Sequence, residues 1–249
     1  NGNGTYSEIA YYSGVHATDW SWAGLMFDMD NDGLRDIFIT NGINHDLTDL
    51  DFVDFFADEI IQKMALTGKK ESIDSIIQKM PIKPQPNFAY RNKGDLTFDK
   101  ANAAWGFEIP TRSNGATYGD LDNDGDLDLV INNVNMEAYV YRNNTDSQKQ
   151  HNYLRMKFRG SEKNPFAIGT TARVYFDSGV VVQELVPSRG FQSSVDYTMA
   201  IGLGEATTID SIRVIWPDDK TQLLENLSPN QELVFTHAEA SDTYRPGTP

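Results

Sequence analysis

Two short segments carry carboxylates at a density and spacing that suggest metal chemistry. DMDNDGLRD spans residues 28–36 (loop 1), and DLDNDGDLD spans residues 120–128 (loop 2). Each has aspartates at positions 1, 3, 5 and 9, and together they hold nine of the chain's 36 acidic residues. Carboxylates held about 5 Å apart repel by roughly 3 kcal/mol per pair at an effective dielectric near 20. A compact loop with this pattern therefore needs a neutralising cation.

The ligand types available favour Ca²⁺ in both loops. Only hard oxygen donors are present, which excludes the thiolate sites of zinc and copper, and Ca²⁺ accepts more ligands and looser geometry than Mg²⁺. Aspartate side chains would bind at positions 1, 3, 5 and 9, and a backbone carbonyl at position 7. The expected ligands are Asp28, Asp30, Asp32, Leu34 and Asp36 in loop 1, and Asp120, Asp122, Asp124, Asp126 and Asp128 in loop 2.

The loops differ from an EF-hand at their ends. An EF-hand needs a bidentate glutamate at position 12 and a helix after it. Position 12 is Ile39 or Ile131, inside a segment that alternates like a strand. Gly33 and Gly125 permit the sharp turn between ligands. The alternative is a pair of acidic turns that hold no ion.

Composition supports a folded acidic protein. The chain has 249 residues, a net charge of −15, 39 % hydrophobic residues and no cysteine. The negative charge argues against nucleic acid or an anionic membrane as partner. The lack of cysteine excludes disulfides and thiol nucleophiles. Since no apolar run reaches the roughly 18 residues that span a bilayer, we expect no transmembrane segment.

The elements around the loops recur at an offset of 92 residues. Residues 2–41 align without a gap to residues 94–133, with 12 identities in 40 positions. Among them, Gly2 and Thr5 match Gly94 and Thr97. The motif YRN follows Asp128 after 13 residues but follows Asp36 only after 54, so the first copy contains an insertion. Each copy is predicted to run strand, acidic loop, strand.

The insertion, at about residues 45–85, reads as two helices. Apolar residues recur at spacings of three and four over residues 49–66, and Gly68 is expected to end this helix. A shorter helix is predicted within residues 70–80, before Pro81. The acidic cluster at the start of the first helix fits a solvated face better than another metal site.

The region after residue 149 has a different pattern. About six short alternating segments are separated by turn signals, as in YLRMKF, ARVYF and SIRVIW. These predict a small β-sandwich. We therefore expect a repeat region at residues 1–148, a sandwich at 149–238 and a tail at 239–249.

The pattern D-x-D-x-D-G-x-x-D between two strands resembles the FG-GAP/VCBS repeat, and AIGTTARVYF, RGFQSS, AIGLGEA and SIRVIWPDD resemble the ASPIC/UnbV domain. The resemblance covers residues 1–44 and 86–236. It departs at Asp219, where that family usually has glycine. It implies a mainly β fold: a partial β-propeller of two FG-GAP-like blades, one with a helical insertion, followed by a small β-sandwich. Propellers need about four to eight blades. We therefore expect further blades from a larger chain, of which this is the C-terminal part, or from another chain.

No catalytic arrangement stands out, so we expect no enzyme in this part of the protein. The four histidines share no motif, and no metalloprotease, nucleophile-elbow or phosphate-loop pattern occurs. Ser193 and Ser194 near Arg189 read as a turn. Glu184 and Asp196 could imitate a glycosidase pair, but nothing in the sequence fixes their separation.

Three functions remain open. The first is a calcium-stabilised binding or adhesion module for protein or glycan that is secreted, periplasmic or on the outer cell surface, most typical of bacteria. The second is the scaffold of a polysaccharide-processing enzyme. The third is a structural subunit of a surface assembly, in which the insertion contacts a partner. Trp20, Trp22 and Trp105 precede the loops and could stack on sugar rings, although core packing is the commoner role of tryptophan.

Overall fold

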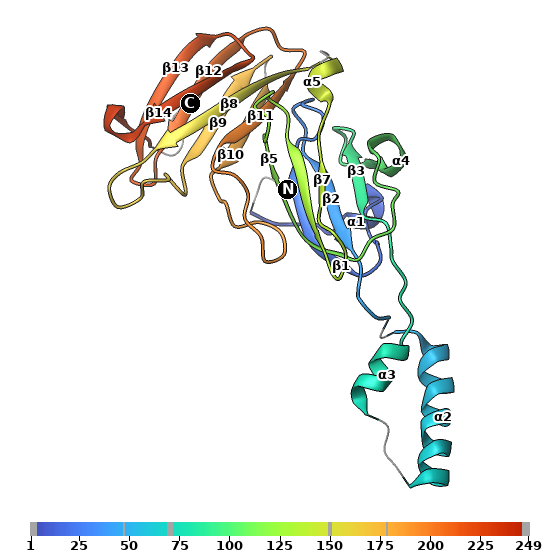
Figure 1. Cartoon of the computed structure of the whole chain (residues 1–249). Coiled ribbons are helices and arrows are strands. Elements are labelled where there is room, and N and C mark those ends of the chain that lie inside the picture. Colours follow the sequence, from blue (N-terminus) through green and yellow to red (C-terminus); the bar gives the residue numbers. More distant parts are fainter. Residues whose placement is uncertain (1–3, 47, 69–71, 149–150, 178, 246–249) are drawn as a thin grey trace.

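The structure is a computed structural model that describes residues 4–46, 48–68, 72–148, 151–177 and 179–245. It confirms a mainly β fold, with about 40 % strand and 15 % helix. The strands of the described residues form four sheets that do not close into a ring (Figure 1).

The first sheet, here called the N-terminal sheet, contains four antiparallel strands in the order β1-β2-β3-β4. Its strands are β1 (Ser21–Phe27), β2 (Asp36–Asn41), β3 (Phe88–Asn92) and β4 (Phe98–Lys100). The middle sheet has three antiparallel strands, namely β5 (Ser113–Gly119), β6 (Asp128–Asn133) and β7 (Tyr139–Tyr141). Strands β1 and β2 begin 92 residues before β5 and β6, as the sequence offset predicts.

The short helices before β1 and β5 also recur at the 92-residue offset. Helix α1 (Ala10–Ser13) precedes β1, and α4 (Asn102–Trp105) precedes β5 at the equivalent place. Each ends at a glycine in the left-handed conformation, Gly14 or Gly106. The helix and its cap therefore belong to the connection that leads from an outer strand into the next sheet.

The N-terminal and middle sheets pack through one apolar cluster. Ala23, Leu25 and Phe27 alternate along β1 toward the middle sheet and are buried there against Leu129 and Ile131. The ring of Phe27 stacks on Tyr118 with centroids 4.4 Å apart. This face-to-face packing fixes where loops 1 and 2, at one end of β1 and β5, lie relative to each other.

A helical arm, residues 45–85, extends away from the sheets between β2 and β3 (Figure 1). It contains α2 (Leu50–Thr67) and α3 (Ile73–Lys79). The Asp49 side chain caps α2 by accepting from the Phe52 N–H, and Gly68 ends the helix as the sequence predicts. The Asp46 N–H donates to the Pro81 carbonyl at 2.8 Å, so the chain enters and leaves the arm at one point.

The C-terminal strands form two facing sheets. One has the order β11-β8-β14, and the other has the order β10-β9-β12-β13-β15. Their core contains Trp216, Leu154 and Ile212, all nearly inaccessible to solvent. The bounds are β8 (Asn152–Arg159), β9 (Thr171–Phe176), β10 (Gly179–Glu184), β11 (Met199–Gly204), β12 (Ile209–Ile215), β13 (Lys220–Leu227), β14 (Gln231–Thr236) and β15 (Asp242–Thr243).

Three further features complete the fold. Helix α5 (Thr145–Gln148) links the middle sheet to β8, and a 3₁₀ turn, η1 (His237–Glu239), follows β14. Strand β15 lies in the expected tail and pairs with β13. Within the described part of the chain, no helix combines the length and the apolar character needed to cross a membrane.

Candidate metal centre

The two acidic loops have the same backbone conformation. The asparagine at position 4 has a positive φ in both, 58° for Asn31 and 64° for Asn123. The glycine at position 6 does too, 88° for Gly33 and 99° for Gly125. Two left-handed residues in so short a segment curl the loop tightly, and only asparagine, aspartate and glycine adopt this conformation readily. The curl directs several aspartate side chains toward one point.

The first aspartate of each loop is held by backbone N–H groups inside the loop. Asp28 accepts from the N–H groups of Asp32 and Gly33, at 3.2 and 2.8 Å. Asp120 accepts from Asp124 and Gly125, both at 3.1 Å. These bonds fix the orientation of the first carboxylate before any ligand arrives.

The last aspartate ties the base of each loop to the chain at the end of the third strand, at the last residue of β3 or two residues after β7. Asp36 accepts from the N–H groups of Met29 and Asn92, at 2.9 and 2.8 Å. Asp128 makes the equivalent pair of bonds with Leu121 and Asn143, at 3.0 and 2.8 Å. Position 9 therefore has a structural role in the described loops in addition to any role as ligand.

Three carboxylates converge in each loop. In loop 1, one oxygen each of Asp28, Asp30 and Asp36 lies within 4.8 Å of the others. In loop 2 the corresponding set is Asp120, Asp122 and Asp124. Separations of this size suit oxygens that share one cation, and the two sets have positions 1 and 3 in common.

The expected ligands outside these clusters are Asp32 and Leu34 in loop 1 and Asp126 and Asp128 in loop 2. Asp32 accepts from the Leu34 N–H at 2.8 Å, and Asp124 accepts from the Asp126 N–H at 3.2 Å. The N–H groups at position 7 thus bond inside the loop, and the predicted role of the Leu34 and Asp126 carbonyls stays a prediction. Asp126 itself is fully buried.

Burial and mutual repulsion disfavour ionisation of the loop carboxylates. The pKa of Asp28 is raised well above its usual value, first by burial and then by the charge of Asp32. Burial raises the pKa of Asp36 to about 7, although its backbone hydrogen bonds oppose the shift. Burial likewise raises the pKa of Asp30, Asp120 and Asp124. A bound cation would favour the ionised form of these groups.

Two arginines that sequence reasoning missed contact the loops. Arg91 reaches Asp30 at 2.7 Å and Asp32 at 3.6 Å. Arg142 reaches Asp122 at 2.8 Å, and Asp124 at 3.4 Å. Both arginines are the middle residue of a YRN motif, and the asparagines of the motif are those that bond the last aspartate. The recurrence of YRN was the signal that could have identified this contact.

A third arginine comes from the C-terminal sheets and contacts only loop 2. Arg155 on β8 is buried, and its Nε lies 3.1 Å from Asp120 Oδ2. Its Nη2 donates to Asn123 Oδ1 at 2.8 Å and pairs with Glu232 at 3.2 Å. No sequence pattern indicated this contact, because it joins segments that are 35 residues apart in different sheets.

Loop 1 meets the C-terminal sheets without a cation at the equivalent point. There the neighbour of Asp28 is Gly202 on β11, so close that a methyl group on Gly202 would clash with the carboxylate. The Gly204 N–H donates to the Asn31 carbonyl at 2.9 Å. Both loops are therefore packed against the C-terminal sheets, and among the described strands of those sheets Arg155 is the one cation paired with a loop aspartate.

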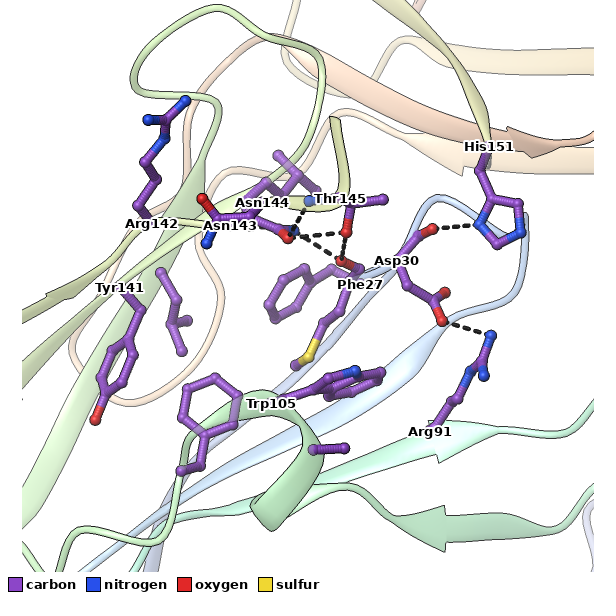
Figure 2. Close-up of a pocket in the computed structure, with 15 residues that line it drawn as sticks. Phe27, Asp30, Arg91, Trp105, Tyr141, Arg142, Asn143, Asn144, Thr145 and His151 are labelled. Carbon is purple, nitrogen blue, oxygen red and sulfur yellow. Dashed lines mark hydrogen bonds and ion pairs between the residues drawn. The ribbon is translucent and has the colours of Figure 1, made fainter. Parts of the chain in front are cut away.

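A pocket of about 320 Å³ lies beside loop 1 (Figure 2). Phe27, Trp105 and Tyr141 form part of its wall, and Arg91 and Asp30 stand together at one side. The Asp30 carbonyl also contacts His151 Nδ1 at 2.6 Å. An aromatic wall beside charged groups can hold a small ligand that has an apolar face and polar substituents.

The serine-rich turn is structural. Ser193 donates to the Phe191 carbonyl at 2.7 Å, and Ser194 donates to the Pro187 carbonyl at 3.3 Å. Arg189 donates to the Glu184 carbonyl at 3.4 Å. These bonds hold the turn against the sheets and leave no nucleophile–base pair among these three side chains.

The other candidates from the sequence are the possible carboxylate pair and the three tryptophans. Glu184 and Asp196 line one cavity of about 20 Å³, which has room for about one water molecule and not for a sugar ring. Trp22 packs on Phe191 with ring centroids 4.8 Å apart, whereas Trp20 is half-buried. Of the three tryptophans, Trp105 alone contributes to the large pocket beside loop 1.

The comparisons with known proteins identify one region. Residues 160–242 match the family described as ASPIC and UnbV, in agreement with the resemblance of the C-terminal segment. The matched residues include strands β9 to β14 and the first residue of β15. No curated protein matches the chain.

Proposed function

We propose that loops 1 and 2 each hold Ca²⁺ and that the chain is a calcium-stabilised binding module. The observation that carries this proposal is the convergence of three carboxylates within 4.8 Å in each of two loops that share left-handed residues at positions 4 and 6. In this proposal the N-terminal and middle sheets are two FG-GAP/VCBS blades of a partial propeller. The ASPIC/UnbV region follows them.

The residues present fit a hard cation. Asp30 Oδ1 is buried and accepts no hydrogen bond from the described residues, so one acceptor in loop 1 is available to a ligand. All converging donors are carboxylate oxygens, and the loop curvature is compatible with the flexible coordination of Ca²⁺. When bound, the ion would supply the positive charge that offsets the burial of these groups, and Asp28, Asp30, Asp36, Asp120, Asp122 and Asp124 would hold it.

A location outside the cytoplasm follows from the same proposal. Extracellular modules bind Ca²⁺ at dissociation constants of about 10⁻⁴ to 10⁻³ M, which matches a milieu rich in the ion. The net charge of −15 and the lack of cysteine are compatible with a secreted, periplasmic or outer-surface protein.

The N-terminal sheet has an open face that suggests further blades as partners. In the middle sheet, Leu129 and Ile131 are buried by the N-terminal sheet. Their equivalents at the 92-residue offset, Ile37 and Ile39, are only half-buried. Met26 on the same face is 54 % exposed. A further sheet could cover this face as the N-terminal sheet covers the middle one.

Two other features favour a recognition role. The pocket beside loop 1 offers Trp105 and Tyr141 to a glycan or a similar small ligand. The arm exposes Phe55, Ile61 and Leu66, which are 76 %, 64 % and 87 % accessible. Exposed apolar side chains on a projecting arm are typical of a protein contact. They support a structural subunit as the second candidate function.

Thermal unfolding with calcium or with EGTA tests the metal proposal. We expect the parent to melt at a higher temperature in millimolar Ca²⁺, because the ion binds only the folded loops. Asp30→Asn and Asp122→Asn should each lose part of this gain. Asp54→Asn, which removes an exposed carboxylate from the arm, should keep all of it. Equal melting of the parent with and without calcium would contradict the proposal.

A further inference from the structure

A second pocket, here called the junction pocket, lies where the N-terminal and middle sheets meet the C-terminal strands. Its volume is about 320 Å³. Met26 on β1, Tyr118 on β5 and Val181 on β10 contribute to its wall. Of the residues that line the pocket beside loop 1, only Phe27 and Leu127 also line the junction pocket, so the two pockets offer separate sites.

Two arginines without an acidic partner line the junction pocket. They are Arg35, at the end of loop 1, and Arg189, in the turn after β10. Arg35 Nη2 donates to the Val182 carbonyl, and Arg189 Nη2 donates to the Glu184 carbonyl at 3.4 Å. Neither guanidinium makes an ion pair with a carboxylate of the described residues, in contrast to the arginines that contact loops 1 and 2. Each therefore keeps N–H donors for an anionic ligand.

Tyr118 adds a hydroxyl group beside the two arginines. Burial raises the pKa of Tyr118, whereas the positive charges of Arg189 and Arg35 lower it, so both guanidinium groups lie near the phenol. The Tyr118 hydroxyl makes no hydrogen bond within the described part of the chain. Because its ring stacks on Phe27 with centroids 4.4 Å apart, the position of this group is fixed by packing.

The turn that carries Arg189 is fixed to the two repeat sheets. Gly190 has a φ of 73° and packs closely against β1 and β5, which leaves little room for a side chain. Thr117 on β5 donates its hydroxyl to the Ser194 carbonyl at 2.6 Å. A donor held in place before binding loses little conformational freedom when a ligand arrives.

The acidic residues at the junction pocket do not occupy the arginines. Both carboxylate oxygens of Asp28 accept from N–H groups inside loop 1. Glu184, the last residue of β10, is exposed and forms no ion pair with Arg35 or Arg189 in the described chain. The pocket therefore presents positive charge although the chain as a whole is acidic.

Arg35 is not a requirement of the loop conformation. It occupies position 8 of loop 1, and position 8 of loop 2 is Leu127. Both loops nevertheless have left-handed residues at positions 4 and 6. The arginine is therefore available for a role in the junction pocket.

We propose that the junction pocket binds a sugar-sized carboxylate, such as a sugar acid, through Arg35 and Arg189. Guanidinium groups suit a planar carboxylate, and Gln183 and Tyr118 offer uncharged polar groups to hydroxyls. The pocket volume is at the lower end of the range for ligand sites, which fits a single ring. A net charge of −15 opposes the approach of polyanions, so a singly charged ligand is favoured. The inference goes beyond the proposed function, because that function does not use this pocket.

Calorimetric titration of the whole chain with galacturonate tests the inference, and galactose is the matched sugar without a carboxylate. We expect galactose to bind at least about tenfold more weakly, because it makes no charge-assisted hydrogen bonds to the arginines. Arg35→Gln and Arg189→Gln should each lower the galacturonate affinity by a similar factor. Arg159→Gln, which changes an exposed arginine on β8, should leave it unchanged.

Equal affinities for the two sugars, or equal galacturonate affinities of the parent and both pocket variants, would overturn the inference. A calcium ion that bridged the ligand to an acidic loop would give the second of these results.

Methyl NMR spectra of the parent locate the ligand without any substitution, so the test holds even if an arginine variant fails to fold. Galacturonate should shift the signals of Met26 and Val181, which line the junction pocket. Shifts confined to Met29, which lines only the pocket beside loop 1, would overturn the inference.

The calcium experiment is scored separately from these titrations. A parent that gains thermal stability from calcium but does not bind galacturonate leaves the metal proposal standing and overturns this inference. A parent that binds galacturonate through the two arginines but melts equally with and without calcium supports this inference and contradicts the metal proposal.

Discussion

Replacement of Arg155 by methionine tests how the C-terminal sheets stabilise loop 2. The variant keeps an apolar side chain of similar length but removes the cation beside Asp120, whose side chain is 2 % exposed. Loss of one partner leaves a buried carboxylate unpaired, which costs about 3 to 5 kcal/mol. For a chain of this size, that corresponds to a fall in melting temperature of roughly 6 to 20 °C.

Thermal unfolding in EGTA and in calcium measures this effect. In EGTA the full loss is expected, because only Arg155 offsets the Asp120 charge from the side of the C-terminal sheets. In calcium the loss should be smaller, since an ion in loop 2 supplies positive charge near the same carboxylate. Arg159→Met, at an exposed position on the same strand, is the matched control and should change little.

Two outcomes would refute this reasoning. If Arg155→Met and Arg159→Met melt alike in EGTA, the buried contact with Asp120 contributes no stability. If the Arg155→Met deficit is the same in calcium and in EGTA, then loop 2 gains no positive charge from the ion.

Three further predictions follow from the loops and the arm. Because burial raises the pKa of Asp36 from 3.8 to about 7, the folded chain holds this proton more tightly than the unfolded chain, and the free energy of unfolding falls as the pH rises from about 4 to about 7; metal-free unfolding should therefore be easier at pH 8 than at pH 5. Gly125→Ala should destabilise the chain more than Gly33→Ala in urea unfolding. Both positions have positive φ, which costs alanine about 1–2 kcal/mol, but the methyl at 125 would also clash with the Tyr153 ring, whereas the methyl at 33 would meet nothing closer than 3.6 Å. Replacing residues 47–80 by two glycines should leave the melting temperature nearly unchanged, since the chain enters and leaves the arm at one hydrogen-bonded point; a large fall would show that the arm supports the sheets.

The sequence was sufficient to locate the loops and the local elements around them. The 92-residue offset predicted where β5 and β6 would begin, because two loops with the same pattern are flanked by strands at the same spacing. Gly68 predicted the end of α2, since glycine readily adopts the left-handed conformation at a helix end. These features depend on residues close together in the chain, for which spacing and backbone preference are informative.

Contacts between distant segments were not accessible to the same reasoning. Arg155 and Gly202 approach the loops only because the C-terminal sheets pack against them, and no local pattern encodes that packing. Arg91 lay within a recurring motif, but a motif alone does not reveal what its side chain contacts. The backbone hydrogen bonds of Asp36 depend in part on Asn92, which the arm separates from it by more than fifty residues.

Anomalous diffraction from crystals grown in millimolar calcium tests the central claim most directly. We predict one anomalous peak in each loop. The calcium in loop 1 would be bound by Asp28, Asp30 and Asp36, and the calcium in loop 2 by Asp120, Asp122 and Asp124. Well-ordered loops without an anomalous peak, in which Arg91, Arg142 and Arg155 alone offset the charge of the aspartates, would contradict the account.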